Sequence, residues 1–377
     1  MAALRCSSVK GLNLFALGSV ELLLITNWLL VIGYKYTIFF AMRVTMGRFA
    51  SNISRNQAYE KMKKCKFEII DGKCVIPEGV TELQNRSFSN CDKLKEVSLP
   101  STVKCIHNEA FYDCWGLTSV EISAGVTTIE PGAFLGCPGI ETIRVVEDNP
   151  VYKSVANCCL TKDGKTLVFG CKTSVIPDTV ETIARSAFQW CEELAAIHIP
   201  PSVKSINSRA FFGCLSLRRL TFSDNGFLAE IGDDSFSHCP ALRMVTLPES
   251  ITGIGKVAFA HCINLWSINI PQSVEHIADG SFYNCPILSN FTLPDTVTSI
   301  GHYAFCGCHN LEGLTIPASV KSIGSHAFAQ CGWHESVKIP GTVEYLGPGV
   351  SSIYVPEEIV IPDKLDPAPK DSYELPF

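Results

Sequence analysis

Charged residues are scarce in this chain of 377 residues, at 18% of the total, and there is no basic excess among them. Lysine and arginine together number 31, against 37 for aspartate and glutamate, so the formal net charge is −6. Because binding to a phosphate backbone needs a basic surface, nucleic acid is not expected as a partner. Hydrophobic residues make up 46% of the chain, which excludes a disordered tail and supplies a sizeable core.

The chain also lacks the short motifs of common catalytic sites. It has no Gly-x-Ser-x-Gly nucleophile motif and no His-Glu-x-x-His zinc motif. The segment Gly253-Ile254-Gly255-Lys256 lacks the earlier glycine and the following serine or threonine that a phosphate-binding loop requires. We therefore expect a protein that is not an enzyme and carries no cofactor.

Cysteine, by contrast, is abundant, and ten of the 18 cysteines occupy one position of a repeat. A phenylalanine, usually preceded by alanine, marks the repeat, and the cysteine follows three residues later. Successive phenylalanines are about 23 residues apart, except for a long step from Phe134 to Phe188 and a slightly longer one from Phe211 to Phe236. The pairs are Phe88 and Cys91, Phe111 and Cys114, Phe134 and Cys137, Phe188 and Cys191, Phe211 and Cys214, Phe236 and Cys239, Phe259 and Cys262, Phe282 and Cys285, Phe305 and Cys308, and Phe328 and Cys331. This period indicates a solenoid and not separate domains.

The repeated unit contains a short alternation of apolar and polar residues, as in Ile268-Asn269-Ile270, which has the period of a strand with one buried face. A proline often follows and ends the strand, because it cannot donate to the ladder. Phe and Cys three residues apart have the spacing of one helical or 3₁₀ turn. We therefore predict an α/β solenoid of about 10–12 coils, with one short parallel strand per coil and a short helical or 3₁₀ turn at Ala-Phe-x-x-Cys.

The unit L-x-x-V-x-I-P-x-S-V-x-x-I-x-x-x-A-F-x-x-C resembles the BspA-like, or Treponema-type, leucine-rich repeat family over about residues 76–346. The long step after Phe134 resembles an insertion of that family, here at about residues 146–175, and Asp163-Gly164 predicts a hairpin within it. The resemblance implies a non-enzymatic surface or secreted binding module. It implies no catalytic residue, because members bind through an extended surface.

The repeat divides the chain into four parts. Residues 1–45 form a hydrophobic N-terminal segment, 46–70 a linker or N-terminal cap, 71–346 the solenoid, and 347–377 a proline-rich C-terminal cap or tail. We expect the solenoid to be monomeric.

Residues 12–41 are the one strongly apolar stretch outside the repeat. A membrane-spanning helix needs about 20 mostly apolar residues, and this stretch reaches that length only by including polar residues such as Glu21 or Lys35. Three interpretations stay open: a membrane anchor, an export signal, or a translation start at Met42 or Met46 that removes the segment. Basic residues after the stretch favour a cytoplasmic solenoid by the positive-inside rule, in conflict with the surface location that the family implies.

We expect the ten repeated cysteines to be reduced and buried. Stacked residues of one column point the same way, whereas a disulfide needs two facing side chains, and free cysteine is among the most buried residue types. For an exported protein, one bridge among Cys158, Cys159 and Cys171 is an alternative.

Two other features resemble sites more weakly. The string Cys306-Gly307-Cys308-His309 resembles a set of zinc ligands, but no second pair follows it, so no metal is expected there. The histidines are scattered, and we expect His238 and His261 to be exposed turn residues.

The outward residues of the strands form the predicted partner-binding face. Three arginines and a tryptophan on adjacent coils have the composition of an interface hot spot, while the alternative is an ordinary solvated face. The candidate residues are His198, Arg218, Arg219, Thr221, Arg243, Thr246, Trp266 and Asn269.

These features predict a non-enzymatic module that binds a protein or glycan partner through the solenoid face. The location is then a cell surface or a membrane-anchored position, with membrane association through residues 12–41. The alternative is an intracellular structural or scaffolding repeat protein, which is cytoplasmic if residues 1–45 are not translated.

Overall fold

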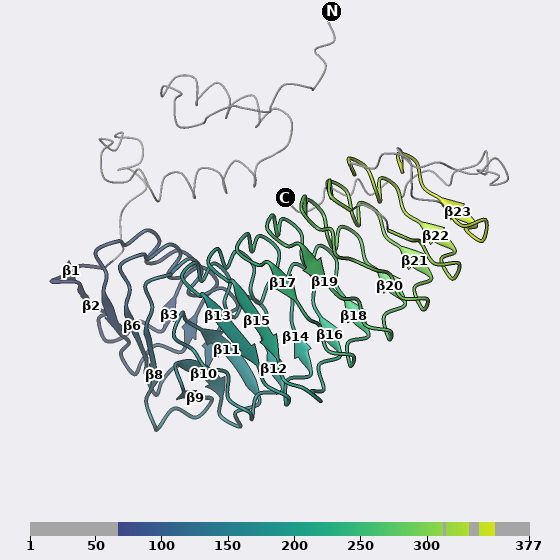
Figure 1. The fold of residues 1–377 in the computed structure, drawn as a ribbon. Helices are drawn as coiled ribbons and strands as arrows, with labels where there is room; N and C mark the ends of the chain where they lie inside the picture. Colours follow the sequence, from purple (N-terminus) through teal and green to yellow (C-terminus); the bar gives the residue numbers. More distant parts are fainter. Residues whose placement is uncertain (1–66, 312–313, 332–338, 351–377) are drawn as a thin grey trace, which may run out of the picture. The chain divides into compact units, whose positions relative to one another are not determined.

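The computed structural model describes residues 67–311, 314–331 and 339–350, which all belong to one compact unit, Lys63–Asp363. In this unit the chain winds through about 12 coils, and neighbouring coils lie side by side (Figure 1). The predicted segment 1–45, and most of the predicted N-terminal cap and C-terminal tail, lie outside the described residues.

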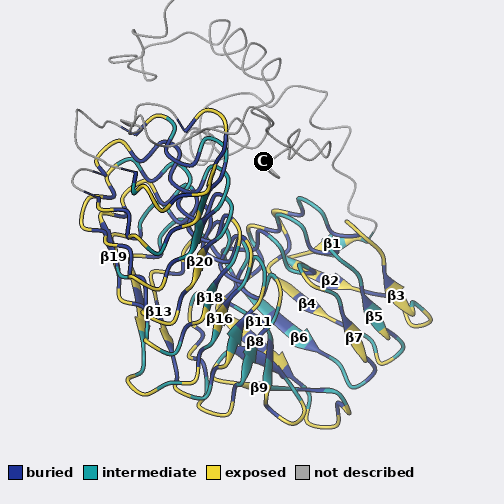
Figure 2. Ribbon diagram, turned by 90° about the vertical axis from the view of Figure 1, so that its right-hand side faces the viewer, coloured by how far each residue is buried: buried dark blue, intermediate teal, exposed yellow. Residues whose placement is uncertain are grey.

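One side of the coils carries strands formed by the Val-x-Ile segments. Neighbouring strands are parallel, and residues one repeat apart are partners, as for Val97 and Val120. The strands of this first sheet face are β2 (Lys73–Val75), β4 (Glu96–Ser98), β6 (Ser119–Ile122), β8 (Thr142–Val145), β13 (Ala196–Ile199), β15 (Arg219–Phe222), β17 (Met244–Val245) and β19 (Ser267–Ile268), and β1 (Ile69–Ile70) pairs antiparallel with β2. Buried and exposed residues alternate along these strands (Figure 2), which places one row of side chains in the core.

A second set of strands forms where an apolar pair precedes the Ala-Phe segment. Ile106 and Ile129 are partners in this second sheet face. Its strands are β3 (Glu82–Leu83), β5 (Cys105–Ile106), β7 (Thr128–Ile129), β12 (Thr182–Ile183), β14 (Ser205–Ile206), β16 (Glu230–Ile231), β18 (Gly253–Ile254), β20 (His276–Ile277), β21 (Ser299–Ile300), β22 (Ser322–Ile323) and β23 (Tyr345–Leu346). One coil therefore carries two strands, such as β6 and β7, where the sequence predicted one.

The Ala-Phe-x-x-Cys segments are turns. The described part of the chain contains no helix, so the predicted α/β class and the helical or 3₁₀ turns are corrected to an all-β solenoid. Glu109 and Asp113, on either side of Phe111, both have φ of 56°, a left-handed conformation that interrupts a helix. The N–H of Phe111 donates to the carbonyl oxygen of Ala133 in the next coil, at 2.9 Å. Alternate N–H groups of the segment, at Phe111 and Asp113, thus bond to the next coil, while that of Tyr112 bonds three residues back, and no continuous helix forms.

The repeated phenylalanines form a column through the core. The rings of Phe88 and Phe111 lie 4.7 Å apart between centroids and 7° from parallel. From Phe188 to Phe328 the same stacking continues at 5.0–5.9 Å. Offset-stacked rings gain more than their buried area alone, so each ring stabilises the contact between two coils.

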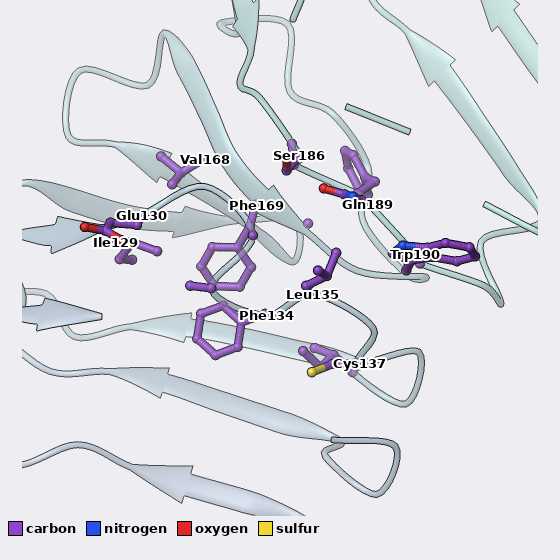
Figure 3. A pocket seen from close by; sticks show the side chains of 17 residues that line it. Ile129, Glu130, Phe134, Leu135, Cys137, Val168, Phe169, Ser186, Gln189 and Trp190 are labelled. Carbon is purple, nitrogen blue, oxygen red and sulfur yellow. The ribbon is translucent and has the colours of Figure 1, made fainter. Parts of the chain in front are cut away.

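An insertion fills the long step between Phe134 and Phe188. Its strands are β9 (Tyr152–Val155), β10 (Cys158–Thr161) and β11 (Thr166–Gly170). β10 pairs antiparallel with both β9 and β11, and β11 pairs parallel with β12 of the second sheet face. Phe169 stacks on Phe134 at 4.6 Å and so adds a ring to the column, as Figure 3 shows. Gly170 lies directly against the ring of Phe188, where a Cβ would collide with the ring. The insertion is therefore built into the stack of coils.

Most of the repeated cysteines add a hydrogen bond between neighbouring coils. The thiol of Cys262 donates to the carbonyl oxygen of Phe236 in the preceding coil at 3.2 Å, and Cys308 makes the same bond to Phe282 at 3.1 Å. All cysteines among the described residues are free. This includes Cys158, Cys159 and Cys171, so the alternative of a bridge among these three is not found.

We predict that the phenylalanine column dominates stability. Phe236→Ala removes a fully buried ring that stacks on Phe211 and Phe259, so the free energy of unfolding should fall by about 3–5 kcal/mol. Chemical denaturation of the full chain measures this loss. Phe227→Ala is the matched control, because Phe227 is 68% exposed and its loss should cost less than about 0.5 kcal/mol. Equal losses in both variants would contradict the prediction.

We also predict that the protein loses stability in alkaline solution. Burial raises the pKa of the Cys331 and Cys158 thiols to about 12, whereas a thiol in the unfolded chain has a pKa of about 8.5. The unfolded chain therefore releases these protons first, so stability is complete below about pH 8.5 and falls as the pH rises towards 12. Denaturation midpoints measured across this range test the sign. In Cys331→Ala the decline should be shallower, and an identical decline would count against a role of this thiol.

Candidate functional site

The predicted partner-binding face lies on the strands β13, β15, β17 and β19. In these strands a buried aliphatic residue such as Leu220 or Val245 anchors the strand in the core, and its neighbours along the chain point outward. Seven of the eight predicted residues are exposed and one, Asn269, is half-buried. The exposed ones are His198, Arg218, Arg219, Thr221, Arg243, Thr246 and Trp266.

The first sheet face is interrupted in the middle of this surface. β13 pairs with β15 and β17 pairs with β19, but the described residues show no ladder between β15 and β17. The interruption coincides with the lengthened step from Phe211 to Phe236, whose additional residues lie between Phe222 and Leu228. There a loop takes the place of the usual proline turn, and its N–H at Phe227 donates to the Pro201 carbonyl at 3.1 Å. The two additional residues of this step thus coincide with the break in the ladder between β15 and β17.

A cleft of about 1050 Å³ lies at the interruption. Six of the eight predicted face residues line it, together with Met244, Asp224 and Glu249. The six are Arg218, Arg219, Thr221, Arg243, Thr246 and Asn269. This volume is in the range of ligand pockets and of grooves that hold a short segment of a partner.

The three arginines are the main source of charge in the cleft. Elsewhere on the same sheet face charges pair between coils, as Lys73 does with Glu96 at 3.0 Å and Arg144 with Glu121 at 3.6 Å. No ion pair among the described residues includes Arg218, Arg219 or Arg243. Their guanidinium groups are therefore exposed at the cleft without a carboxylate of the described chain bound to them.

Three of the predicted residues, His198, Thr221 and Asn269, already serve the fold. The amide of Asn269 accepts from the N–H of Leu247 at 2.6 Å and donates to the carbonyl of the same residue at 2.9 Å. His198 lies 3.0 Å from the Thr221 hydroxyl and 2.9 Å from that of Ser223. These side chains hold neighbouring coils together, so they are less free to contact a partner than the arginines.

Apolar side chains flank the arginines. Trp266 is 42% exposed and follows Arg243 in the next coil, where its N–H donates to the Arg243 carbonyl at 2.9 Å, but it does not line the cleft. Met244, which is exposed next to Arg243, does line the cleft. Its place beside Arg243, one residue before a buried valine, marks it as an outward residue.

The metal-like string is divided among structural contacts. Cys306 is buried, and burial raises the pKa of its thiol to about 11. The thiol of Cys308 is bonded to the Phe282 carbonyl, and the Nδ1 of His309 lies 2.6 Å from the carbonyl oxygen of Gln330. Cys308 and His309 thus have separate partners, and Cys306 is buried apart from them.

His238 and His261 lie in turns, as predicted, but the prediction that they are exposed is wrong. Their rings pack against each other at 4.3 Å between centroids, tilted by 34°, and Phe212 packs against His238 at 4.9 Å, tilted by 37°. These contacts make a second aromatic column beside the first. Burial lowers the pKa of His238 to about 3 and that of His261 to about 4. Both rings are therefore neutral packing residues at physiological pH.

A small cavity of about 30 Å³ lies beside Phe134, Phe169 and Trp190 (Figure 3). It occurs where the insertion joins the column. A ligand pocket has about 300 Å³ or more, so this cavity is a packing gap and not a binding site.

Similarity to known proteins agrees with the fold. A leucine rich cell surface protein from Faecalibacterium prausnitzii A2-165 has a solved structure that is 35% identical, with a TM-score of 0.50, and the match covers 57% of this chain and 58% of that one. A second solved structure is a leucine-rich repeat protein from Eubacterium ventriosum ATCC 27560, with 19% identity and a TM-score of 0.53. The match covers 79% of this chain and 86% of that one, and at this identity it shows a likeness in fold alone. The comparison with curated proteins gives no match.

Among the described residues no helix has the length and apolar character to span a membrane, and the predicted stretch 12–41 lies outside them. The family model described as the BspA type leucine rich repeat region matches residues 59–162, 169–288 and 275–373, in 6 copies. The prediction from the repeat pattern is therefore confirmed, and this chain belongs to the BspA-type leucine-rich repeat family.

Proposed function

We propose that this chain is a non-enzymatic binding module that takes an anionic segment of a protein or glycan partner in the cleft between β15 and β17. The observation that carries the proposal is the presence of Arg218, Arg219 and Arg243 at this cleft, exposed and outside every ion pair of the described residues. Membership of a family with a repeat fold suited to binding supports it.

The chemistry of the cleft favours an acidic partner. Each guanidinium presents a planar set of donors that matches a carboxylate, sulfate or phosphate group. Met244 and Trp266 beside the arginines offer apolar contact area, and aromatic residues with arginine are typical of interface hot spots. Asp224 and Glu249 on the cleft wall repel anions, so they restrict how an acidic segment lies across the arginines.

We place this activity at a cell surface. The similar structure from Faecalibacterium prausnitzii is named a leucine rich cell surface protein, which supports this location. The alternative is an intracellular scaffolding protein, favoured by the basic residues that follow residues 12–41.

Removal of two cleft arginines should weaken binding and leave stability unchanged. For a double variant with Arg219→Ala and Arg243→Ala, we expect the affinity for immobilised heparin or a polyglutamate peptide to fall about tenfold or more. At high salt the difference in affinity between wild type and variant should be smaller, because salt screens the charges. The melting temperature should stay the same, because both side chains are exposed.

Arg144→Ala is the matched control for this experiment. Arg144 is exposed on β8 of the same sheet face, but Glu121 pairs with it and it lies outside the cleft. Its loss should leave affinity unchanged. Equal affinity of wild type and double variant, or no binding of wild type to either probe, would defeat the proposed anionic partner.

The surface location predicts labelling of intact cells. A membrane-impermeant amine reagent should biotinylate exposed lysines of the solenoid, such as Lys73 and Lys204, as fully as it does in permeabilised cells. Mass spectrometry of the labelled peptides measures this. Labelling of these lysines only after permeabilisation would favour the intracellular scaffold.

A further inference from the structure

The second sheet face carries a cluster of potential metal ligands away from the cleft. Cys105 and His107 point outward on either side of the buried Ile106 at the end of β5. Glu82 in β3 is the ladder partner of Cys105 in the preceding coil, and Glu130 follows β7 in the next coil. Three neighbouring coils thus bring a thiol, an imidazole and two carboxylates to one place.

The donor atoms of this cluster are close together. The ligand atoms of Cys105, His107 and Glu130 all lie within 4.8 Å of one another. The Nδ1 of His107 is 3.0 Å from Oε1 of Glu130, and its Nε2 is 3.3 Å from Oε2 of Glu82. The other oxygen of Glu130 accepts from the N–H of Asn108 at 2.8 Å, which fixes the carboxylate and leaves Oε1 directed at the ring.

Cys105 differs from the other cysteines that the structure describes. The Cys105 side chain is half-exposed, whereas the other cysteines among the described residues are buried. Most of the repeated cysteines also donate to a phenylalanine carbonyl. The side chain of His107 is 25% exposed, so solvent and ions reach the cluster. Partial burial, together with the charges of Glu130 and Glu82, raises the pKa of Cys105, and a bound cation would oppose this effect.

We propose that Cys105, His107 and Glu130 form a site for a thiophilic divalent cation, with Zn²⁺ as the best match. Zinc takes sulfur, imidazole and carboxylate ligands and is commonly four-coordinate, and a thiolate ligand selects against Mg²⁺ and Ca²⁺. Nδ1 of His107, Sγ of Cys105 and Oε1 of Glu130 bind the ion, and water fills the fourth position.

Glu82 is a positioning residue of this site. Metal-binding imidazoles donate their second ring N–H to a carboxylate or carbonyl, which fixes the tautomer and the ring orientation. Glu82 accepts in this way from Nε2 of His107. Because ligands from separate coils converge, a bound ion joins adjacent coils directly. The proposal is independent of the arginine cleft.

Metal binding by the full chain tests this site. The apo protein is titrated with Zn²⁺ against a chromophoric chelator, and with Co²⁺ to observe the thiolate-to-cobalt charge-transfer band. Wild type should bind a single Zn²⁺ ion and show the band. Cys105→Ser should abolish the band, and the Zn²⁺ affinity of Cys105→Ser and Glu130→Gln should fall by about 100-fold or more. Glu82→Gln should keep the band and lose about tenfold in affinity.

Cys306→Ser is the matched control. Cys306 is also outside the repeated column, but it is buried and belongs to the metal-like string near the other end of the solenoid. Its substitution should change neither the affinity nor the band. Absence of Zn²⁺ binding by folded wild type, or loss of the band in Cys306→Ser but not in Cys105→Ser, would overturn the proposal and leave His107 as a bridge between two carboxylates.

Discussion

Contact between adjacent coils is the constraint on which the rest of this structure depends. The N–H of Phe111 bonds to Ala133 in the next coil, and its ring stacks on the rings before and after it. The thiol of Cys137 in turn donates to the Phe111 carbonyl at 2.9 Å. A single coil leaves these groups without partners, and an unpaired buried polar group is costly. Each coil must therefore place its phenylalanine and its cysteine against those of the neighbouring coils, whatever the length of chain between them.

This constraint explains which features could be predicted from the sequence. The phenylalanines and cysteines of the column repeat with a constant spacing, so the solenoid, the buried thiols and the family follow from the pattern alone. The all-β turn does not follow, because the partner of the Phe111 N–H belongs to the next coil, and the local spacing of Phe and Cys fits a helix equally well. The burial of His238 was missed for a related reason, since only its ring contacts with Phe212 and His261 in the neighbouring coils reveal the second column.

The two irregular steps mark where the structure departs from the repeat. In the long step before Phe188, Phe169 supplies a ring to the column and Gly170 makes room for Phe188, so the insertion keeps the core continuous. In the step from Phe211 to Phe236 the column also continues, with the two rings at 5.1 Å, but the first sheet face separates between β15 and β17. The additional residues thus leave the core continuous but interrupt the first sheet face, and the cleft lies at that interruption. The longer spacing between Phe211 and Phe236 is visible in the sequence, but the loss of the ladder between β15 and β17 could be found only in the structure.

Chemistry on such a solenoid is assembled across coils and not along the chain. Arg218 and Arg243 are a full repeat apart in the sequence, as are His107 and Glu130, yet each pair occupies neighbouring coils. A search for short motifs therefore finds the string around Cys306, in which Cys308 and His309 have separate partners, and overlooks the cluster at Cys105. Because outward positions alternate with the buried aliphatic residues of the strands, substitutions at the outward positions leave the core in place. The inter-coil contacts of the core therefore leave the chemistry of such a surface open to change.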